Sequence, residues 1–366
     1  MKKILLICND SNTVINFRKE LIRFLLEKDF NVYVIAGDRK REEDIKKLGV
    51  TFSCIPFSNR SKSIFSSMKL VSSFKKEILK IAPDIVLTFQ IKPNIFGAKA
   101  AKSCKISNIY CMIEGLGDPF QPKNFKGKIL RILVSWLYRK SLKHAKKVFF
   151  LNRDDKDEFI KRKIISNSKI VLIPGIGIDT KKYIATYKFE SQKKVVNLSR
   201  LIKNKGIIEY CEIARLTRKF RPDIIFELYG EEDELTKADL QSFISDGSIV
   251  YSGYSNDAAS VIANATFIVS TSYREGCSRV IMEAMAMGRP SLASNVIGNR
   301  DLVIDKETGY LLDLHDLNTF VECILNNIDD NELLIKIGKK ARQICEEKYD
   351  STMINKKIVD IISTNN

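Results

Sequence analysis

Short runs of consecutive apolar residues alternate with amphipathic stretches along almost the whole chain. Residues 3–8 (KILLIC) form the first such run, and residues 15–27 follow with apolar side chains at helical spacing. The alternation continues to about residue 173 and restarts near residue 195. Strands that are apolar at every position and are separated by helices are typical of a parallel sheet covered on both faces. The pattern therefore predicts an α/β protein with two doubly wound, Rossmann-like domains.

The predicted elements form two series. Expected strands are 3–8, 31–36, 52–57, 84–89, 108–113, 147–151 and 169–173, then 195–198, 224–229, 249–251, 267–270 and 291–294. Expected helices are 15–27, 42–48, 64–81, 94–104, 127–144, a short one from 154, and then 207–220, 234–243, 258–263, 278–288, 317–327, 332–347 and 351–362. A polar loop is expected at 9–13 and a turn at 308–309.

Proline and glycine cluster between the two series, in the sequence PGIGID at residues 174–179. We expect a hinge there. It would separate an N-terminal domain at 1–175 from a C-terminal domain at 176–345, with a last helix at 346–366 that returns to the N-terminal domain. The domains are expected to face each other across a cleft. Because ligands of open α/β sheets bind beyond the carboxyl ends of the strands, the cleft is the predicted site.

The net excess of positive charge lies entirely in the first half of the chain. The whole sequence has a net charge of +17, whereas residues 1–175 contain 36 Lys and Arg against 16 Asp and Glu, which gives +20. A domain with this excess favours an anionic partner. Nucleic acid and an anionic membrane surface with phosphorylated lipid both satisfy that requirement.

The number and spacing of the cysteines and histidines argue against a disulfide framework and against a zinc site. Eight cysteines are scattered without a CxxC pair, and there are only two histidines, His144 and His315. This pattern fits neither a disulfide framework nor a zinc site. No run of eighteen apolar residues is present, and residues 1–8 are too short for a signal peptide. We therefore expect a protein that stays in the cytoplasm.

The stretch from Ser270 to Pro290 is the centre of the candidate chemistry. A helix is expected to begin at Ser278 and to end at Gly288, so that Glu275 precedes it and Glu283 lies about 7–8 Å along its axis. A helix N-terminus can hold a pyrophosphate without a metal, and carboxylates accept hydrogen bonds from hydroxyls. A nucleotide sugar supplies both groups. Alone, two glutamates at this spacing are more often a loop acid and an ordinary helix former, so the rest of the sequence must decide.

Two cations follow the first strand of the second domain. Arg200 and Lys205 lie in the sequence SRLIKNKG, just beyond the carboxyl end of that strand. A guanidinium and an ammonium there could clamp a diphosphate leaving group. Cations in a lysine-rich loop are more often only solvated, but their combination with Glu275 and Glu283 favours a binding site.

These motifs resemble the donor-binding half of the retaining glycosyltransferases called family 4, which have the two-Rossmann GT-B fold. The resemblance covers residues 195–312 and rests on SRLIKNKG, on the stretch from YSGYSNDAAS through TSYREGCSRVIMEAMAMGRP to GNRDLV, and on TGYLL. The first half is similar through FRKE, IKPNIFGAKAA and EGLG. Together they resemble the subgroup that extends undecaprenyl-diphosphate-linked saccharides in O-antigen, capsule and N-glycan assembly.

The resemblance implies a role for each matched residue of the second domain. Glu283 would bind the ribose hydroxyls, and Arg200 and Lys205 would neutralise the diphosphate as the sugar bond breaks. Glu275 and the backbone N–H groups of residues 276–278 (Gly276, Cys277 and Ser278) would hold hydroxyls of the transferred sugar. It also implies a UDP-sugar as co-substrate, and no metal or other cofactor.

The first domain departs from the family pattern at two places. Asn12 and Thr13 stand where many members have a Gly-rich turn that binds the donor, and Glu114 stands where many have a histidine. Glu114 could orient the donor sugar or the acceptor, or only cap a loop. We predict that Arg18, Lys92 and Asn94 bind the acceptor diphosphate. The alternative for both cations is solvent exposure.

The predicted function is a retaining, metal-independent transfer of a hexose or N-acetylhexosamine to a lipid-diphosphate-linked sugar on the cytoplasmic face of the inner membrane. Residues 125–147 and 57–76 combine apolar and basic side chains and could contact the anionic inner leaflet, although each could also be a helix that covers a sheet. Two alternatives stay open: a two-Rossmann UDP-sugar epimerase, and a basic nucleic-acid-binding protein. The latter lacks aromatic residues on a known nucleic-acid module, so we expect no nucleic-acid partner.

Overall fold

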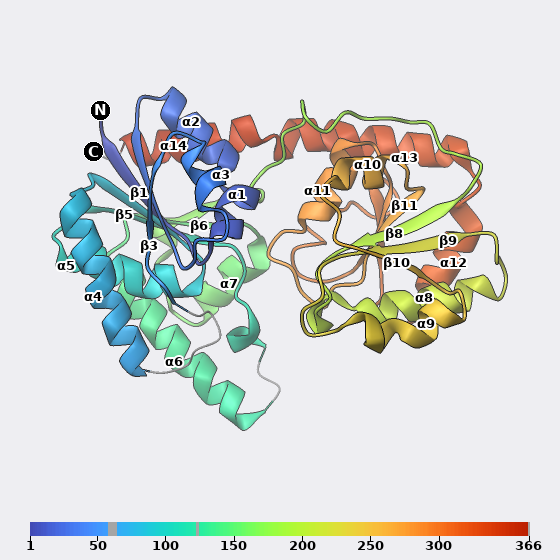
Figure 1. Ribbon diagram of the computed structural model, residues 1–366, viewed down its shortest axis with the longest axis horizontal. Helices are drawn as coiled ribbons and strands as arrows, with labels where there is room; N and C mark the ends of the chain where they lie inside the picture. The colour runs from blue at the N-terminus through green and yellow to red at the C-terminus, as the bar shows by residue number, and fades with distance from the viewer. Residues whose placement is uncertain (58–63, 122–123, 365–366) are drawn as a thin grey trace. The chain divides into compact units, whose positions relative to one another are not determined.

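The computed structural model describes residues 1–57, 64–121 and 124–364 (Figure 1). The chain forms two compact units. The first consists of Met1–Ile176 together with Ser351–Asn366, and the second of Gly177–Asp350. The change of unit near residue 176 falls in the sequence PGIGID. Residues 346–350, which we had placed with the last helix, lie with the second unit.

The first unit contains a parallel sheet of seven strands in the order β3-β2-β1-β4-β5-β6-β7. Its strands are β1 (Lys3–Ile7), β2 (Asn31–Ala36), β3 (Thr51–Cys54), β4 (Ile85–Phe89), β5 (Asn108–Ile113), β6 (Lys147–Phe150) and β7 (Ile170–Leu172). Strand order reverses between β1 and β4, which pair in register with Ile4 opposite Ile85. Polar side chains after these two strands therefore lie at a topological switch point, where ligands of such sheets bind.

Helices connect these strands in the alternation that the sequence predicted. They are α1 (Ser11–Phe17), α2 (Lys19–Glu27), α3 (Glu42–Lys46), α4 (Ile64–Ile81), α5 (Ala98–Ser103), α6 (Phe125–Leu142), α7 (Arg153–Lys161) and α14 (Ser351–Thr364), with shorter turns η1 (Pro93–Gly97), η2 (Asp118–Phe120) and η3 (Asn167–Lys169). The last helix, α14, packs against α2, and its Lys357 ammonium donates to the carbonyl of Leu172 at 3.0 Å.

The first helical segment differs from the prediction. A single helix was expected at 15–27 after a polar loop, but two helices are present, α1 and α2, separated at Arg18. The carboxylate of Asp10 caps α1 by accepting from the backbone N–H of Thr13 at 2.8 Å and from its hydroxyl at 2.9 Å. Since this cap starts the helix at Ser11, most of the predicted loop is the first turn of α1.

The second unit contains a parallel sheet of six strands in the order β10-β9-β8-β11-β12-β13. Its strands are β8 (Lys194–Leu198), β9 (Ile225–Tyr229), β10 (Val250–Gly253), β11 (Phe267–Ser270), β12 (Ser291–Ser294) and β13 (Gly309–Leu312). Its helices and turns are η4 (Lys203–Lys205), α8 (Ile207–Arg218), η5 (Lys237–Leu240), α9 (Gln241–Ser245), α10 (Ala258–Ala263), α11 (Arg279–Ala286), α12 (Leu317–Asn327), α13 (Asn331–Ile344) and η6 (Cys345–Tyr349). Each unit therefore confirms the predicted doubly wound, Rossmann-like architecture.

One strand of this sheet was missed. A turn was expected at 308–309 and no strand after it, but Gly309 begins β13, which pairs with β12. A Cβ at Gly309 would lie 2.6 Å from the carbonyl oxygen of Ser291, so the pairing requires glycine there. The strand is short, and its first residue is one that intrinsic strand preference disfavours.

Candidate active site

Helix α11 begins at the carboxyl edge of the second sheet. It runs from Arg279 to Ala286, close to the predicted bounds, with Ser278 at the N-cap position. The Ser278 side chain does not cap the helix, so it leaves the first-turn N–H groups to other acceptors. Gly288 has φ +66 and follows the helix, as the sequence predicted for its end. The helix thus presents a positive N-terminus beside the loop that carries Glu275.

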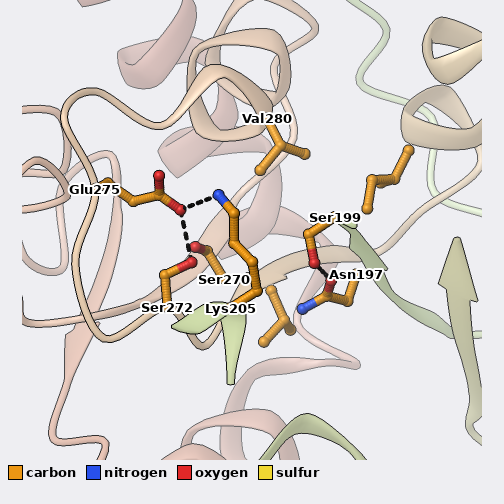
Figure 2. Close-up of a pocket in the computed structure, with 9 residues that line it drawn as sticks. Asn197, Ser199, Lys205, Ser270, Ser272, Glu275 and Val280 are labelled. Carbon is orange, nitrogen blue, oxygen red and sulfur yellow. Dashed lines mark hydrogen bonds and ion pairs between the residues drawn. The ribbon is translucent and has the colours of Figure 1, made fainter. Parts of the chain in front are cut away.

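Lys205 and Glu275 form an ion pair at this edge. The Lys205 ammonium lies 2.5 Å from Oε1 of Glu275, which also accepts from the Ser272 hydroxyl at 2.6 Å. Both charged side chains are largely buried, with exposed fractions of 26% and 12%. Figure 2 shows the pair in a hollow that Asn197, Ser199 and Val280 also line. The structure therefore brings together two of the predicted residues, 70 positions apart, near the start of α11.

Backbone contacts fix the two loops that carry this pair. Gly206 follows Lys205 at φ +63, and a Cβ there would lie 1.9 Å from the carbonyl oxygen of Thr271. The Thr271 hydroxyl in turn donates to the Gly206 carbonyl at 2.7 Å. Gly298 has φ +86, and a Cβ there would lie 2.5 Å from the carbonyl oxygen of Glu275. Only glycine allows these approaches, so the positions of Lys205 and Glu275 depend on both glycines.

Arg200 is not part of this hollow. Its side chain is 62% exposed, and one guanidinium nitrogen lies 3.3 Å from Oδ2 of Asp233. Because Arg200 follows β8 within five residues of Lys205, it belongs to the same sheet edge. The structure therefore places one of the two predicted cations beside α11 and leaves the other paired with an acid. Asp233 gave no signal in the sequence.

Glu283 lies inside α11 and is held by two residues that the sequence analysis missed. Oε1 of Glu283 accepts from the Tyr183 hydroxyl at 2.8 Å and from Nε of Arg279 at 2.8 Å. Glu283 is 6% exposed. Burial, followed by the Glu283 charge, raises the pKa of Tyr183, so its hydroxyl keeps its proton. Arg279 could have been found from its spacing of four from Glu283, but Tyr183 could not.

Arg18 and Glu114 form a second buried ion pair, in the first unit. The Arg18 guanidinium donates to Oε1 of Glu114, which directly follows β5, and stacks 4.1 Å from the ring centroid of Phe89 at the end of β4. The Arg18 side chain is 2% exposed and that of Glu114 16%. The structure therefore joins two predicted acceptor-binding residues, and the burial of Arg18 contradicts the alternative that its side chain is solvent-exposed.

Three other first-unit candidates fare differently. Asn94 is fully buried, because its amide donates to the carbonyl of Met112 at 2.8 Å and its oxygen accepts from the hydroxyl of Thr88 at 2.6 Å. These bonds give Asn94 a structural task in place of the predicted acceptor contact. The Thr13 hydroxyl likewise donates a hydrogen bond to the carboxylate of Asp10. Asn12, by contrast, is exposed in the first turn of α1.

Lys92 immediately precedes η1 and is partly buried. Burial lowers the pKa of its ammonium. An anionic group beside a partly desolvated ammonium at the carboxyl edge of a sheet would favour its charged form. The acceptor role of Lys92 stays a prediction.

The arrangement in the second unit can bind a diphosphate and hydroxyl groups together. A helix N-terminus and one ammonium supply the positive side, while two buried carboxylates supply acceptors. Among the described residues, no group of His, Cys, Asp and Glu has a metal-binding arrangement. Likewise, no described helix has the length and hydropathy needed to cross a bilayer.

Two family descriptions match the sequence in consecutive regions. "Glycosyltransferase Family 4" matches residues 17–182, and "Glycosyl transferases group 1" matches residues 179–344. The first match contains the Arg18–Glu114 pair, and the second contains both Lys205–Glu275 and Glu283. Each of the two candidate clusters therefore lies within a matched region.

Two curated bacterial proteins are similar over most of the chain. The N,N'-diacetylbacillosaminyl-diphospho-undecaprenol alpha-1,3-N-acetylgalactosaminyltransferase of Campylobacter jejuni is 26% identical over 93% of both chains. The UDP-Gal:alpha-D-GlcNAc-diphosphoundecaprenol alpha-1,3-galactosyltransferase of Escherichia coli is 25% identical over 87% of this chain and 85% of its own. Among solved structures, Anabaena Alr3699/HepE in complex with UDP and glucose has a TM-score of 0.80 at 18% identity, with both chains fully covered. This structural similarity shows the fold.

Proposed function

This chain belongs to the GT-B glycosyltransferases, and we propose that it moves a hexose or an N-acetylhexosamine from a UDP-sugar to a sugar linked to undecaprenyl diphosphate. The observation that carries the proposal is the Lys205–Glu275 pair beside the N-terminus of α11. The two curated relatives, whose names specify undecaprenyl-diphosphate-linked acceptors, support the acceptor class. One of them is an N-acetylgalactosaminyltransferase, which makes an N-acetylhexosamine the first donor to test.

The second unit would bind the donor. The N-terminus of α11 and the ammonium of Lys205 would hold the diphosphate, and Arg200 would leave Asp233 to join them. Glu283, already oriented by Tyr183, would accept hydrogen bonds from the ribose hydroxyls. Glu275 and the backbone of residues 276–278 would hold hydroxyls of the transferred sugar.

The chemical step would retain the configuration of the sugar. The bond between the anomeric carbon and the diphosphate oxygen breaks, and its electron pair leaves with UDP. The acceptor hydroxyl attacks the same face of the sugar and gives its proton to an oxygen of the departing phosphate. Negative charge grows on the diphosphate in this step, so fixed cations lower the barrier. We therefore expect transfer without a divalent metal and unchanged rates in EDTA.

The first unit would bind the acceptor at the carboxyl edge of its sheet. Lys92 would contact the acceptor diphosphate, and Glu114, held by Arg18, would orient the acceptor or the donor sugar. An acceptor of this kind is embedded in a membrane, so the enzyme would work at the cytoplasmic face of the inner membrane.

A donor screen tests the proposal. The protein is incubated with UDP-GalNAc, UDP-GlcNAc, UDP-Gal or UDP-Glc and a synthetic polyprenyl-diphosphate sugar, and the products are analysed by mass spectrometry. We expect one added sugar from at least one donor. Failure with all four donors and several acceptor sugars would overturn the proposal. A new sugar epimer formed without acceptor would instead revive the epimerase alternative, which the two curated relatives described above do not support.

A further inference from the structure

Helix α6 has two apolar faces, and only one of them is covered. Its inner face includes Val134, Tyr138 and Leu142, which belong to the core of the first unit. Its outer face exposes large apolar side chains at helical spacing, namely Phe125 (75%), Ile129 (52%), Ile132 (67%), Leu133 (43%) and Trp136 (49%). Residues at this spacing form one continuous stripe. The sheet-covering interpretation of this segment thus explains half of the helix and leaves the stripe without a role.

Cations continue the stripe toward the C-terminal end of the helix. Arg139, Lys140 and Lys143 follow Trp136 by three, four and seven residues, which places them on the same face. Lys140 lies over the Trp136 ring, with its ammonium 5.2 Å from the ring centroid. The segment 125–147 contains eight Lys and Arg and no Asp or Glu. The outer face of α6 therefore carries large exposed apolar side chains along its first three turns, interrupted by Lys128, and cations after Trp136.

A basic hollow adjoins this cationic end. It has a volume of about 360 Å³, and its walls include Arg139 and Lys143 from α6, Lys163 from the loop after α7, and Lys169 before β7. Its remaining lining is mostly aliphatic, with Leu142, Ile160, Ile164 and Ile165. In the described part of the chain, no carboxylate forms an ion pair with Lys140, Lys143 or Lys163. The hollow therefore offers cations to the anionic head of a phospholipid and aliphatic side chains to its apolar tail.

Hydrogen bonds fix the walls of the hollow. The Arg139 guanidinium donates to the carbonyls of Lys163 and Arg162, each at 2.8 Å. The Lys169 ammonium donates to the carbonyls of Lys143 at 2.6 Å and Ala145 at 2.8 Å. Arg139 and Lys169 are therefore anchored by carbonyl groups, and among the described residues no acid forms an ion pair with either of them.

We propose that the outer face of α6 docks on an anionic lipid bilayer, with its apolar stripe inserted among the acyl chains and lipid phosphates held by the cations at its C-terminal end and in the adjoining hollow. Helices with an apolar face, a tryptophan and flanking cations lie in the interface plane and insert by about 5–10 Å. The unit also has the sign of charge that an anionic leaflet attracts. The second predicted membrane segment, 57–76, includes residues outside those described.

Trp136 makes the proposal directly testable, because it is the only tryptophan of the chain. Full-length protein is mixed with vesicles of phosphatidylcholine alone or with added phosphatidylglycerol, and binding is measured by flotation and by Trp136 fluorescence. No UDP-sugar or acceptor is present, so the result is independent of the proposed transferase activity. We expect binding to the anionic vesicles only, a shift of Trp136 emission to shorter wavelength, and quenching by brominated lipid. Binding should weaken as salt is raised.

Variants separate the two parts of the surface. Lys140→Gln and Lys143→Gln should each weaken binding to anionic vesicles about fivefold, as expected for one charge near such a surface. Ile129→Ser with Ile132→Ser should abolish the shift of Trp136 emission. Leu79→Ser, at an exposed position of α4 in the same unit, is the matched control and should bind as the wild type does.

Three outcomes would overturn the proposal. The first is no binding to anionic vesicles. The second is binding with unchanged Trp136 emission, which would place the contact on another face. The third is a concentration-dependent shift of Trp136 emission without lipid, with a matching increase in mass, which would show that a second copy of the chain covers the stripe.

Discussion

The ammonium of Lys205 lies 2.5 Å from Oε1 of Glu275, although the two residues are 70 positions apart. Lys205 follows β8 and Glu275 follows β11, and these strands are parallel neighbours in the sheet. Without a substrate the two charges compensate each other. A bound diphosphate would compete with Glu275 for Lys205 and would free the carboxylate for sugar hydroxyls. We therefore expect the pair to couple the two halves of donor recognition.

This coupling predicts opposite effects of two substitutions on UDP binding. Lys205→Met should weaken UDP binding by about tenfold or more, since a charge-assisted hydrogen bond contributes about 1.5–3 kcal/mol. Glu275→Gln should leave UDP affinity unchanged or increased, because it frees Lys205, while transfer falls at least a hundredfold. Calorimetric titration with UDP and a transfer assay measure the two effects. Lys203→Met, an exposed neighbour in η4, is the control and should change neither. Equal loss of UDP affinity in both variants would contradict the coupling.

Glu283 and Tyr183 should act together in donor binding and in stability. Tyr183→Phe removes one hydrogen bond and should lower the free energy of unfolding by about 1 kcal/mol. It should raise KM for the UDP-sugar several-fold with little change in kcat, because Glu283 loses its orientation.

Glu283→Ala should abolish transfer and lower the free energy of unfolding by about 1–3 kcal/mol, since it leaves the buried Tyr183 hydroxyl without its acceptor. Denaturant unfolding and steady-state kinetics test both, with Glu322→Ala on the exposed side of α12 as control. Full activity of Glu283→Ala would exclude its role.

The buried Arg18–Glu114 pair predicts that one substitution harms the fold more than two. Glu114→Ala leaves a guanidinium uncompensated in the core and should reduce the free energy of unfolding by about 3–5 kcal/mol. The double variant Arg18→Met with Glu114→Leu removes both charges and should recover most of that loss without recovering transfer. Unfolding monitored by circular dichroism decides between the variants. If the double variant were as unstable as Glu114→Ala, the loss would come from packing and not from the unpaired charge.

Two glycines with the same backbone conformation should differ in their tolerance of alanine. Gly206 and Gly253 have φ values of +63 and +68, but only at Gly206 would a Cβ collide with the backbone, at 1.9 Å from Thr271. Gly253→Ala should cost about 1 kcal/mol for the left-handed conformation alone. Gly206→Ala should cost several times more and should displace Lys205. Melting temperature and UDP affinity measure these losses, and equal melting temperatures for the two variants would count against the close approach.

His144 provides a pH-dependent probe of the basic surface at the end of α6. Partial burial and the cations Lys143, Lys102 and Lys169 lower its pKa below the ordinary 6.5. The unfolded chain therefore binds this proton at higher pH than the folded chain does. The contribution of His144 to stability is complete above pH 6.5 and is lost as the pH falls from there through the lowered pKa of the folded chain. NMR titration of His144 should show the lowered pKa. A short-chain anionic phospholipid should raise the pKa of His144, and an unchanged value would argue against lipid binding there.

The sequence alone determined the architecture of each unit. Apolar runs separated by helical periodicity specify buried parallel strands, because strands covered on both faces need apolar residues at every position. Local chemistry also determined the end of α11, where Gly288 follows the helix, whereas the Ser278 side chain, expected as its N-cap, does not cap it. By contrast, the predicted start of the first helix was wrong, because the cap that Asp10 provides was overlooked.

Only the tertiary structure decided which candidate side chains meet. Local hydrophobic periodicity predicts the strands but not their order in the sheet. That order brings Lys205 to Glu275. The same is true of Tyr183, which reaches Glu283 from a loop 100 residues earlier. It is also true of Asn94, whose burial depends on the packing of η1 against neighbouring strands. Local sequence sets backbone conformation and burial pattern, whereas long-range packing sets the partners of each polar side chain.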